Sequence, residues 1–185
     1  PRAMAVLDPI KLVLTNWDEL FPYSAANQAA TDNGMVNDGS VMDACTAPIH
    51  PHHPELGNRH FKLGKEVWIE RTDFEETPPK GFFRLFVGNK VRLKYGHVIE
   101  CTGFNKDAAG NVTEVQATVV PDTKSGTPGS ASVKVKGVIT WVAAADAQTA
   151  EVRLYDRLFT AEHPDAGGKD HMASLNPNSL KIIQA

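Results

Sequence analysis

Cysteine is scarce in this 185-residue sequence, and no long apolar run occurs in it. The two cysteines, Cys45 and Cys101, lie far apart and form no C-x-x-C pair, so the sequence indicates neither a disulfide framework nor a zinc ribbon. No segment approaches the roughly 20 apolar residues that a membrane-spanning helix needs, and no signal peptide is visible. These absences favour a reducing setting, and we expect a cytoplasmic protein with no membrane partner.

Common catalytic motifs are also missing. The chain has no G-x-S-x-G elbow, no phosphate-binding Gly-rich loop, no Cys/His catalytic pairing and no zincin motif. One acidic cluster consists of Glu70, Asp73, Glu75 and Glu76. A catalytic carboxylate pair is conceivable there, but solvated loop charge is the better interpretation. The residues alone therefore predict a binding module with no catalytic residues and no cofactor of its own.

Acidic residues are absent between Thr77 and Ile99, although the whole chain has a net charge of −3. The basic residues of this stretch are Lys80, Arg84, Lys90, Arg92 and Lys94. Because no carboxylate nearby in the sequence cancels them, we expect a local positive field suited to a polyanion. Lys and Arg also keep the solvent-facing side of many sheets soluble, so the charge alone leaves both interpretations open.

The same stretch alternates in polarity on both sides of Gly88-Asn89, which predicts a hairpin with arms at 82–87 and 91–95. On this prediction Phe82 and Phe86 share a face with Arg84. A nucleic-acid base could then stack on an aromatic ring while the arginine contacts its edge. The alternative is that these rings belong to the core of a closed barrel.

Strand-like alternation recurs along most of the chain, in segments 3–6, 10–14, 66–71, 97–104, 112–120, 134–142 and 151–159. Helical periodicity is almost absent, so we predict an all-β fold made of a barrel or a pair of barrels. Segment 15–47 has no sustained period and is rich in Ala, Asn, Asp and Gly. We therefore expect first strands at 1–14, a flexible insertion with at most a helical turn at 15–47, and β-barrels at 48–185.

Three histidines, His50, His52 and His53, lie close together in a proline-rich segment. Imidazole is a common metal ligand, so a histidine-rich metal barrel is the enzyme-class rival to a binding module. The prolines favour an extended segment instead, and no further ligand motif completes a set. We predict no metal site.

A resemblance to a known family rests on four segments: Pro1-Arg-Ala-Met-Ala-Val, Trp68-Ile-Glu-Arg, Lys134-Val-Lys-Gly-Val-Ile-Thr-Trp-Val and Glu151-Val-Arg-Leu-Tyr-Asp-Arg-Leu-Phe. With these the chain resembles the C-terminal anticodon-binding region of bacterial glutaminyl-tRNA synthetases. The resemblance implies two six-stranded antiparallel β-barrels similar to ribosomal protein L25. It also implies a parent class I ligase, whose catalytic domain, absent here, attaches glutamine to tRNA with ATP and Mg²⁺. The implied partners are the tRNA(Gln) anticodon loop and that catalytic domain, in a monomer.

The resemblance also implies roles for single residues. Arg2 matches the arginine used on the middle uridine of the anticodon, Arg84 the one on the third-position guanine, and Arg92 the one near the first position. His52 stands where relatives often have Asn beside the loop, and Phe83 stands where some have Lys. With Lys80 and Lys94 from the basic stretch, these residues form the predicted RNA-binding set.

Two alternatives remain at this point. One is a general RNA-binding barrel, such as an L25-like binder of ribosomal RNA, and the other is the anticodon domain of a glutamyl-tRNA synthetase. The chain begins with Pro1 and stops at Ala185, whereas the family continues and returns to complete the fold. We therefore expect a piece of a longer protein, with one barrel incomplete at its C-terminal side, weaker tRNA binding and blurred specificity.

Overall fold

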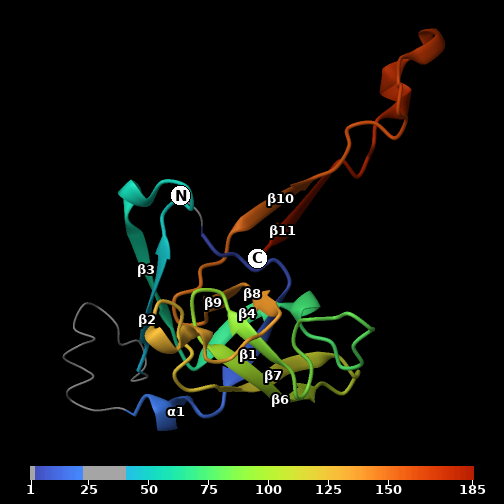
Figure 1. Ribbon diagram of the computed structural model, residues 1–185. Coiled ribbons are helices and arrows are strands. Elements are labelled where there is room, and N and C mark those ends of the chain that lie inside the picture. The colour runs from blue at the N-terminus through green and yellow to red at the C-terminus, as the bar shows by residue number, and fades with distance from the viewer. Residues whose placement is uncertain (1–2, 23–40) are drawn as a thin grey trace. The chain divides into compact units, whose positions relative to one another are not determined.

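The computed structural model describes residues 3–22 and 41–185 (Figure 1). The chain divides into two compact units, residues 1–147 and 148–185. The described helices and strands are β1 (Pro9–Leu14), α1 (Trp17–Leu20), β2 (Asp43–Pro48), β3 (Asn58–Leu63), β4 (Glu66–Glu70), β5 (Lys90–Leu93), β6 (Val98–Lys106), β7 (Val112–Val119), β8 (Gly137–Ile139), β9 (Trp141–Ala143), β10 (Glu151–Tyr155) and β11 (Leu180–Gln184). Short 3-10 turns occupy Pro54–Leu56, Arg71–Asp73, Pro128–Ala131, Ala166–Gly168 and His171–Ser174. The predicted division at 14/15 and 47/48 stays a prediction.

The main sheet of the first unit is nearly closed on itself. Its strand order is β8-β5-β6-β7-β1-β4-β9. Only Thr140 separates β8 from β9 in the chain, so the two outermost strands are continuous with each other and the sheet curls into a barrel shape (Figure 1). The all-β barrel prediction is confirmed. The sheet has seven strands and two parallel pairs, β1 with β7 and β5 with β8, which differs from the six antiparallel strands that the resemblance implied.

Alternating side chains of the strands build the core. Strand β1 buries Ile10, Leu12 and Leu14 and turns the residues between them outward, as its period of two predicts. Trp17 and Trp141 are the largest fully buried side chains. Each buried Ile or Leu side chain contributes about 1.5–3 kcal/mol, so this core stabilises the barrel.

Several strand predictions hold and others are wrong. The β6–β7 hairpin is confirmed, with Gly110 near its tip. Residues 3–6 do not form a strand. The segment 134–142 is not one strand, because β8 pairs with β5 whereas β9 pairs with β4. The break at Thr140 lets one alternating segment serve both edges of the sheet, which a sequence pattern cannot reveal.

The predicted hairpin around Gly88-Asn89 is also wrong in its first arm. Residues 82–87 form no strand, and only Leu85 makes an isolated bridge, to Phe74. Gly81 and Gly88 have positive φ angles of 90° and 86°, so the chain turns sharply at both ends of the segment. The second arm is β5, which ends at Leu93 rather than at residue 95.

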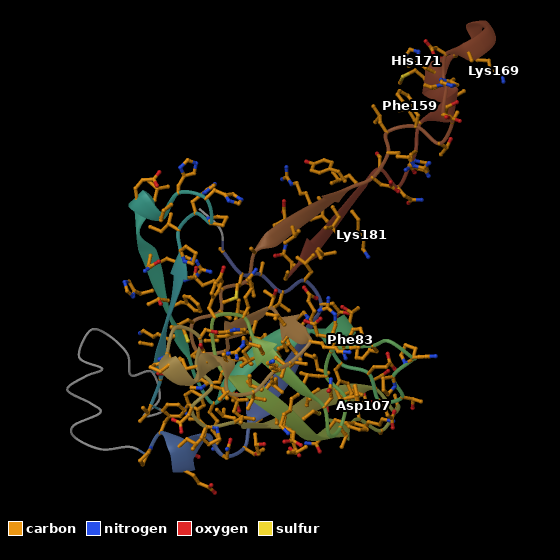
Figure 2. The ribbon with its side chains drawn as sticks, in the orientation of Figure 1. Phe83, Asp107, Phe159, Lys169, His171 and Lys181 are labelled. Atoms are coloured by element: carbon orange, nitrogen blue, oxygen red, sulfur yellow. The ribbon has the colours of Figure 1, made fainter. Side chains whose placement is uncertain are left out.

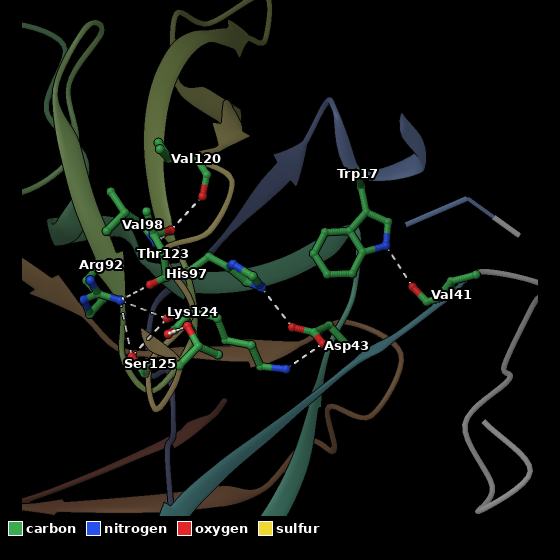
Figure 3. Close-up of polar contacts among 12 residues, drawn as sticks. Trp17, Val41, Asp43, Arg92, His97, Val98, Val120, Thr123, Lys124 and Ser125 are labelled. Atoms are coloured by element: carbon green, nitrogen blue, oxygen red, sulfur yellow. Dashed lines mark hydrogen bonds and ion pairs between the residues drawn. The ribbon is translucent and has the colours of Figure 1, made fainter. Parts of the chain in front are cut away.

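A second hairpin of the first unit, β2–β3, pairs in continuous register from Asp43 with Leu63 to Pro48 with Asn58. Its histidine-rich turn lies at the end away from Asp43. Within the predicted insertion 15–47, Trp17 Nε1 donates to the Val41 carbonyl at 2.8 Å (Figure 3). The predicted helical turn is present as α1, while residues 23–40 lie outside the described part of the chain.

The second unit is built on the antiparallel pair β10–β11. Beyond it, a bridge between Phe159 and Leu175 ties together a loop with two 3-10 turns. Several of its large apolar side chains are exposed, among them Tyr155, Leu158 and Ile182. Within residues 3–22 and 41–185, no helix has the length and apolar character needed to cross a membrane.

Candidate nucleic-acid interface

Arg84 is held by a buried carboxylate. Its Nη1 donates to Asp73 Oδ1, and the Asp73 side chain is 4% exposed whereas that of Arg84 is 50% exposed. Burial raises the pKa of Asp73, and the adjacent Arg84 charge opposes this shift. Asp73 is therefore not the solvated loop charge that the sequence predicted. The expectation that no carboxylate offsets the basic stretch is also wrong, because Asp73 meets Arg84 and Glu100 meets Lys90 at 2.9 Å.

The backbone around Arg84 is fixed as well. The Leu85 amide donates to the Asp73 carbonyl at 2.9 Å, and the Glu75 amide donates to the Leu85 carbonyl at 3.0 Å. The Asn89 side chain donates to the Arg84 carbonyl at 2.6 Å. Leu85 is fully buried and anchors the segment to the core. The segment is thus ordered without being a strand, and it presents the residues on either side of Leu85 at the surface.

Phe83 directly precedes Arg84 and has half of its surface exposed. Figure 2 labels its position in the first unit. The ammonium of Lys136 lies over the Phe83 ring, 4.8 Å from its centroid. Gly137 lets the Phe83 backbone lie close to the next strand residue after Lys136, because a Cβ at position 137 would overlap the Phe83 carbonyl oxygen. We call Phe83, Arg84 and Lys136 the Arg84 surface. It combines an exposed aromatic ring, a guanidinium and a second cation.

Arg92 has a different environment. Its Nη1 donates to the carbonyls of Gly96 and Thr123 at 3.2 and 2.6 Å and to Ser125 Oγ at 3.3 Å (Figure 3). Its Nη2 donates to the Ser130 carbonyl at 2.5 Å. Burial lowers the pKa of this guanidinium. Most of its donors are therefore committed to the loop from Thr123 to Ser130.

The other predicted residues are spread over the first unit. Lys80 and Lys94 are exposed, and the backbone of Lys94 is fixed by its amide donating to Ile139 at 3.0 Å. His52 is exposed in the turn of the β2–β3 hairpin, on a different element from Arg84. Arg2 lies outside the described residues. Of the predicted residues, Phe83 and Arg84 are thus neighbours in the chain, and Lys136 contacts the Phe83 ring.

The three histidines of the hairpin turn contact one another through their rings. The centroid of the His50 ring lies 4.6 Å from that of His53 and 6.0 Å from that of His52. His53 Nδ1 lies 2.8 Å from Glu55 Oε1. Throughout the part of the chain that the structure describes, no group of three or more His, Cys, Asp or Glu side chains is arranged to hold a metal ion.

Sequence reasoning missed two members of the site, Asp73 and Lys136. Asp73 carried no usable signal, because its partner is separated from it by the loop 74–83. Lys136 did carry one. It precedes Gly137 inside a strand pattern, and an isolated glycine in such a pattern indicates a close backbone approach, here to Phe83.

Comparisons with known proteins give the same family for both parts of the chain. The family model described as "tRNA synthetases class I (E and Q), anti-codon binding domain" matches residues 1–120, and a second model of the same description matches residues 138–185. A glutamine–tRNA ligase of Ralstonia pickettii (strain 12J) is 58% identical over 185 residues, which are 100% of this chain and 29% of that protein. Those of Cupriavidus taiwanensis and Bordetella avium are 58% and 56% identical over 184 residues, covering 100% of this chain and 28% of each relative. The chain thus spans less than a third of the length of these relatives.

Proposed function

Because the chain belongs to the anticodon-binding domain family of the class I glutamyl- and glutaminyl-tRNA synthetases, we propose that it reads the anticodon loop of a glutamine tRNA. The similar proteins named glutamine–tRNA ligase, 55–58% identical over the chain, favour glutamine over glutamate. The parent protein would attach glutamine to this tRNA in the cytoplasm. Its catalytic domain, elsewhere in the same chain, would use ATP and Mg²⁺, and we propose that it acts as a monomer.

The Arg84 surface is the observation that carries this proposal. RNA-binding proteins read unpaired loop bases by stacking them on aromatic rings and by hydrogen bonding to their edges. Phe83 offers a half-exposed ring. Arg84 has five N–H donors, and among the described residues only Asp73 accepts from its side chain. The remaining donors suit the O6 and N7 acceptors of a guanine, which supports the assignment of Arg84 to the third anticodon position.

The other predicted residues take supporting roles in this proposal. Lys80 and Lys94, both exposed, would contact phosphates, which adds affinity without base specificity. Arg92, committed to the loop from Thr123 to Ser130, would act on the first position mainly by orienting that loop. Arg2 would contact the middle uridine, and His52 would lie beside the anticodon loop.

A binding titration tests the proposal. The 185-residue chain is titrated, at fixed moderate salt, with the anticodon stem-loop of the glutamine tRNA and with copies altered at the middle uridine or the third-position guanine. We expect a clear preference for the unaltered loop, because each good base contact is worth about 1–3 kcal/mol. Equal binding to all loops would mean either that strands beyond this chain carry the discrimination or that the chain is a general RNA-binding barrel. The same titration on a longer piece of the parent protein separates these two outcomes.

A further inference from the structure

We infer that Asp73 is a positioning residue for base reading: it fixes the direction of the Arg84 guanidinium and thereby sets the discrimination at the base that Arg84 contacts. This inference rests on the proposed function. Asp73 itself does not contact the RNA, because its side chain is 4% exposed. It acts through Arg84, whose side chain is half exposed and bonded to it.

Asp73 holds the Arg84 segment at two points. Its carboxylate accepts from the Arg84 guanidinium, and its backbone carbonyl accepts from the next residue, Leu85, at 2.9 Å. Asp73 is itself fixed, because it closes the 3-10 turn Arg71–Asp73, in which the Phe74 amide donates to the Arg71 carbonyl at 3.2 Å. The position and the direction of the guanidinium are therefore both set by Asp73, in the 3-10 turn that follows β4.

This arrangement reduces the cost of ordering a long side chain. A free arginine loses rotamer entropy when it binds a base, and one already directed by a carboxylate loses less. The pairing has a second effect on selectivity. Because Asp73 offsets part of the Arg84 charge, it weakens the attraction of Arg84 to phosphates, which are the same at every position of the RNA.

The neighbouring acidic residues do not share this role. Glu70 accepts from the amides of Leu7 and Asp8 at 2.6 and 3.1 Å, so its carboxylate is bound to the segment before β1. Glu76 pairs with Lys106 at 2.6 Å. Glu75 is exposed in the same loop and therefore gives a matched control for the loss of one carboxylate near Arg84.

The test compares the wild-type chain with Asp73→Asn and the control Glu75→Gln. Each is titrated with the glutamine anticodon stem-loop and with a copy carrying adenine at the third position. We expect Asp73→Asn to reduce the ratio of the two affinities about tenfold, the scale of one good base contact. The affinity for the altered loop should stay unchanged or rise, and it should depend more steeply on salt. The reason is that Arg84, without its carboxylate partner, can contact RNA phosphates. Glu75→Gln should keep the wild-type ratio.

A double-mutant cycle separates positioning from a structural effect. In the Arg84→Ala background Asp73→Asn should change the ratio no further, since the residue through which it acts is gone. If Arg84→Ala lowers the ratio but Asp73→Asn does not, the inference is overturned while the proposed function stands. If Arg84→Ala itself leaves the ratio unchanged, the proposed base-reading role of Arg84 fails.

Folding is checked for each variant by its urea unfolding curve. If Asp73→Asn does not unfold cooperatively, Asp73→Ser carries the same test, because it removes the charge and fits within the buried volume. A variant that loses affinity for both loops by the same factor would show that Asp73 only supports the fold, which also overturns the inference.

Discussion

Arg84 and Arg92 come from one basic stretch, yet the protein places them in opposite environments. Arg84 gives one donor to a buried carboxylate and extends the rest of a half-exposed side chain toward solvent. Arg92 directs its donors to the loop from Thr123 to Ser130. The charge of the two residues is the same, so charge alone does not identify the binding residue. What differs is the number of guanidinium N–H donors that stay free once the protein's own acceptors are bonded.

The largest expected difference between Arg84 and Arg92 is in their contribution to the free energy of unfolding. Arg92→Ala would leave the Thr123 and Ser130 carbonyls without their donor, and we expect it to lower the free energy of unfolding by about 2–4 kcal/mol. Lys80→Ala, at an exposed position of the same stretch, should stay within about 0.5 kcal/mol of the wild type. Urea denaturation followed by tryptophan fluorescence measures both. A small effect of Arg92→Ala would mean that Arg92 resembles Arg84 after all.

The loop that Arg92 holds is also tied to the β2–β3 hairpin through Asp43. Asp43 accepts from His97 Nε2 at 2.9 Å and from Lys124 Nζ at 2.7 Å (Figure 3). Burial alone would raise the pKa of Asp43, but these two partners outweigh it and lower the pKa below its ordinary value of 3.8. Asp73 has the opposite shift, because burial prevails there. The two aspartates therefore give stability a different pH dependence.

We expect Asp43→Asn to cost about 1–2 kcal/mol of unfolding free energy at pH 7, since His97 and Lys124 lose a charged acceptor. A carboxylate with a lowered folded-state pKa contributes stability above its unfolded pKa, and this contribution disappears as the pH falls through the folded value. The difference between wild type and Asp43→Asn should therefore shrink below about pH 4. Denaturation curves between pH 7 and pH 3 test this.

Asp73 supplies the contrasting case. Its raised pKa means that the folded chain holds a proton more tightly than the unfolded chain, so its contribution to stability grows as the pH falls toward the unfolded value. Asp73→Asn should remove that gain. If both aspartate variants showed the same pH profile, the difference in environment between the two sites would be refuted.

Sequence patterns predicted what depends on local alternation. Strands β1 and β4 and the β6–β7 hairpin follow from apolar residues at every second position. The same alternation failed at 82–87, where only Leu85 reaches the core and glycines turn the chain at both ends. The pattern could not distinguish a strand from a loop held by hydrogen bonds, since these bonds come from Asp73 and Asn89.

The candidate site was predictable in its exposed members and not in their surroundings. Arg84 followed from its interleaving with Phe82 and Phe86 and from the family resemblance, whereas Phe83 followed from the resemblance alone. The commitment of Arg92 could not be predicted, because most of its partners are backbone carbonyls, which every residue has. The inferred role of Asp73 depends on tertiary contacts that bring Arg84 and Leu85 back to Asp73 after the loop 74–83.

The smallest of the expected effects concerns Phe83 and tests whether the Arg84 surface binds RNA with more than its charge. Phe83→Ala should weaken binding of the glutamine anticodon stem-loop about fivefold, the lower end of the ~1–3 kcal/mol for a stacked base, because Lys136 already covers one face of the ring. Val87→Ala is the matched control, since Val87 is equally exposed, at 50%, in the same segment. Titrations of both variants at two salt concentrations separate stacking from charge. A loss in Phe83→Ala that vanished at high salt would assign the surface to phosphate binding, whereas a loss that persisted would indicate that the ring itself contacts a base.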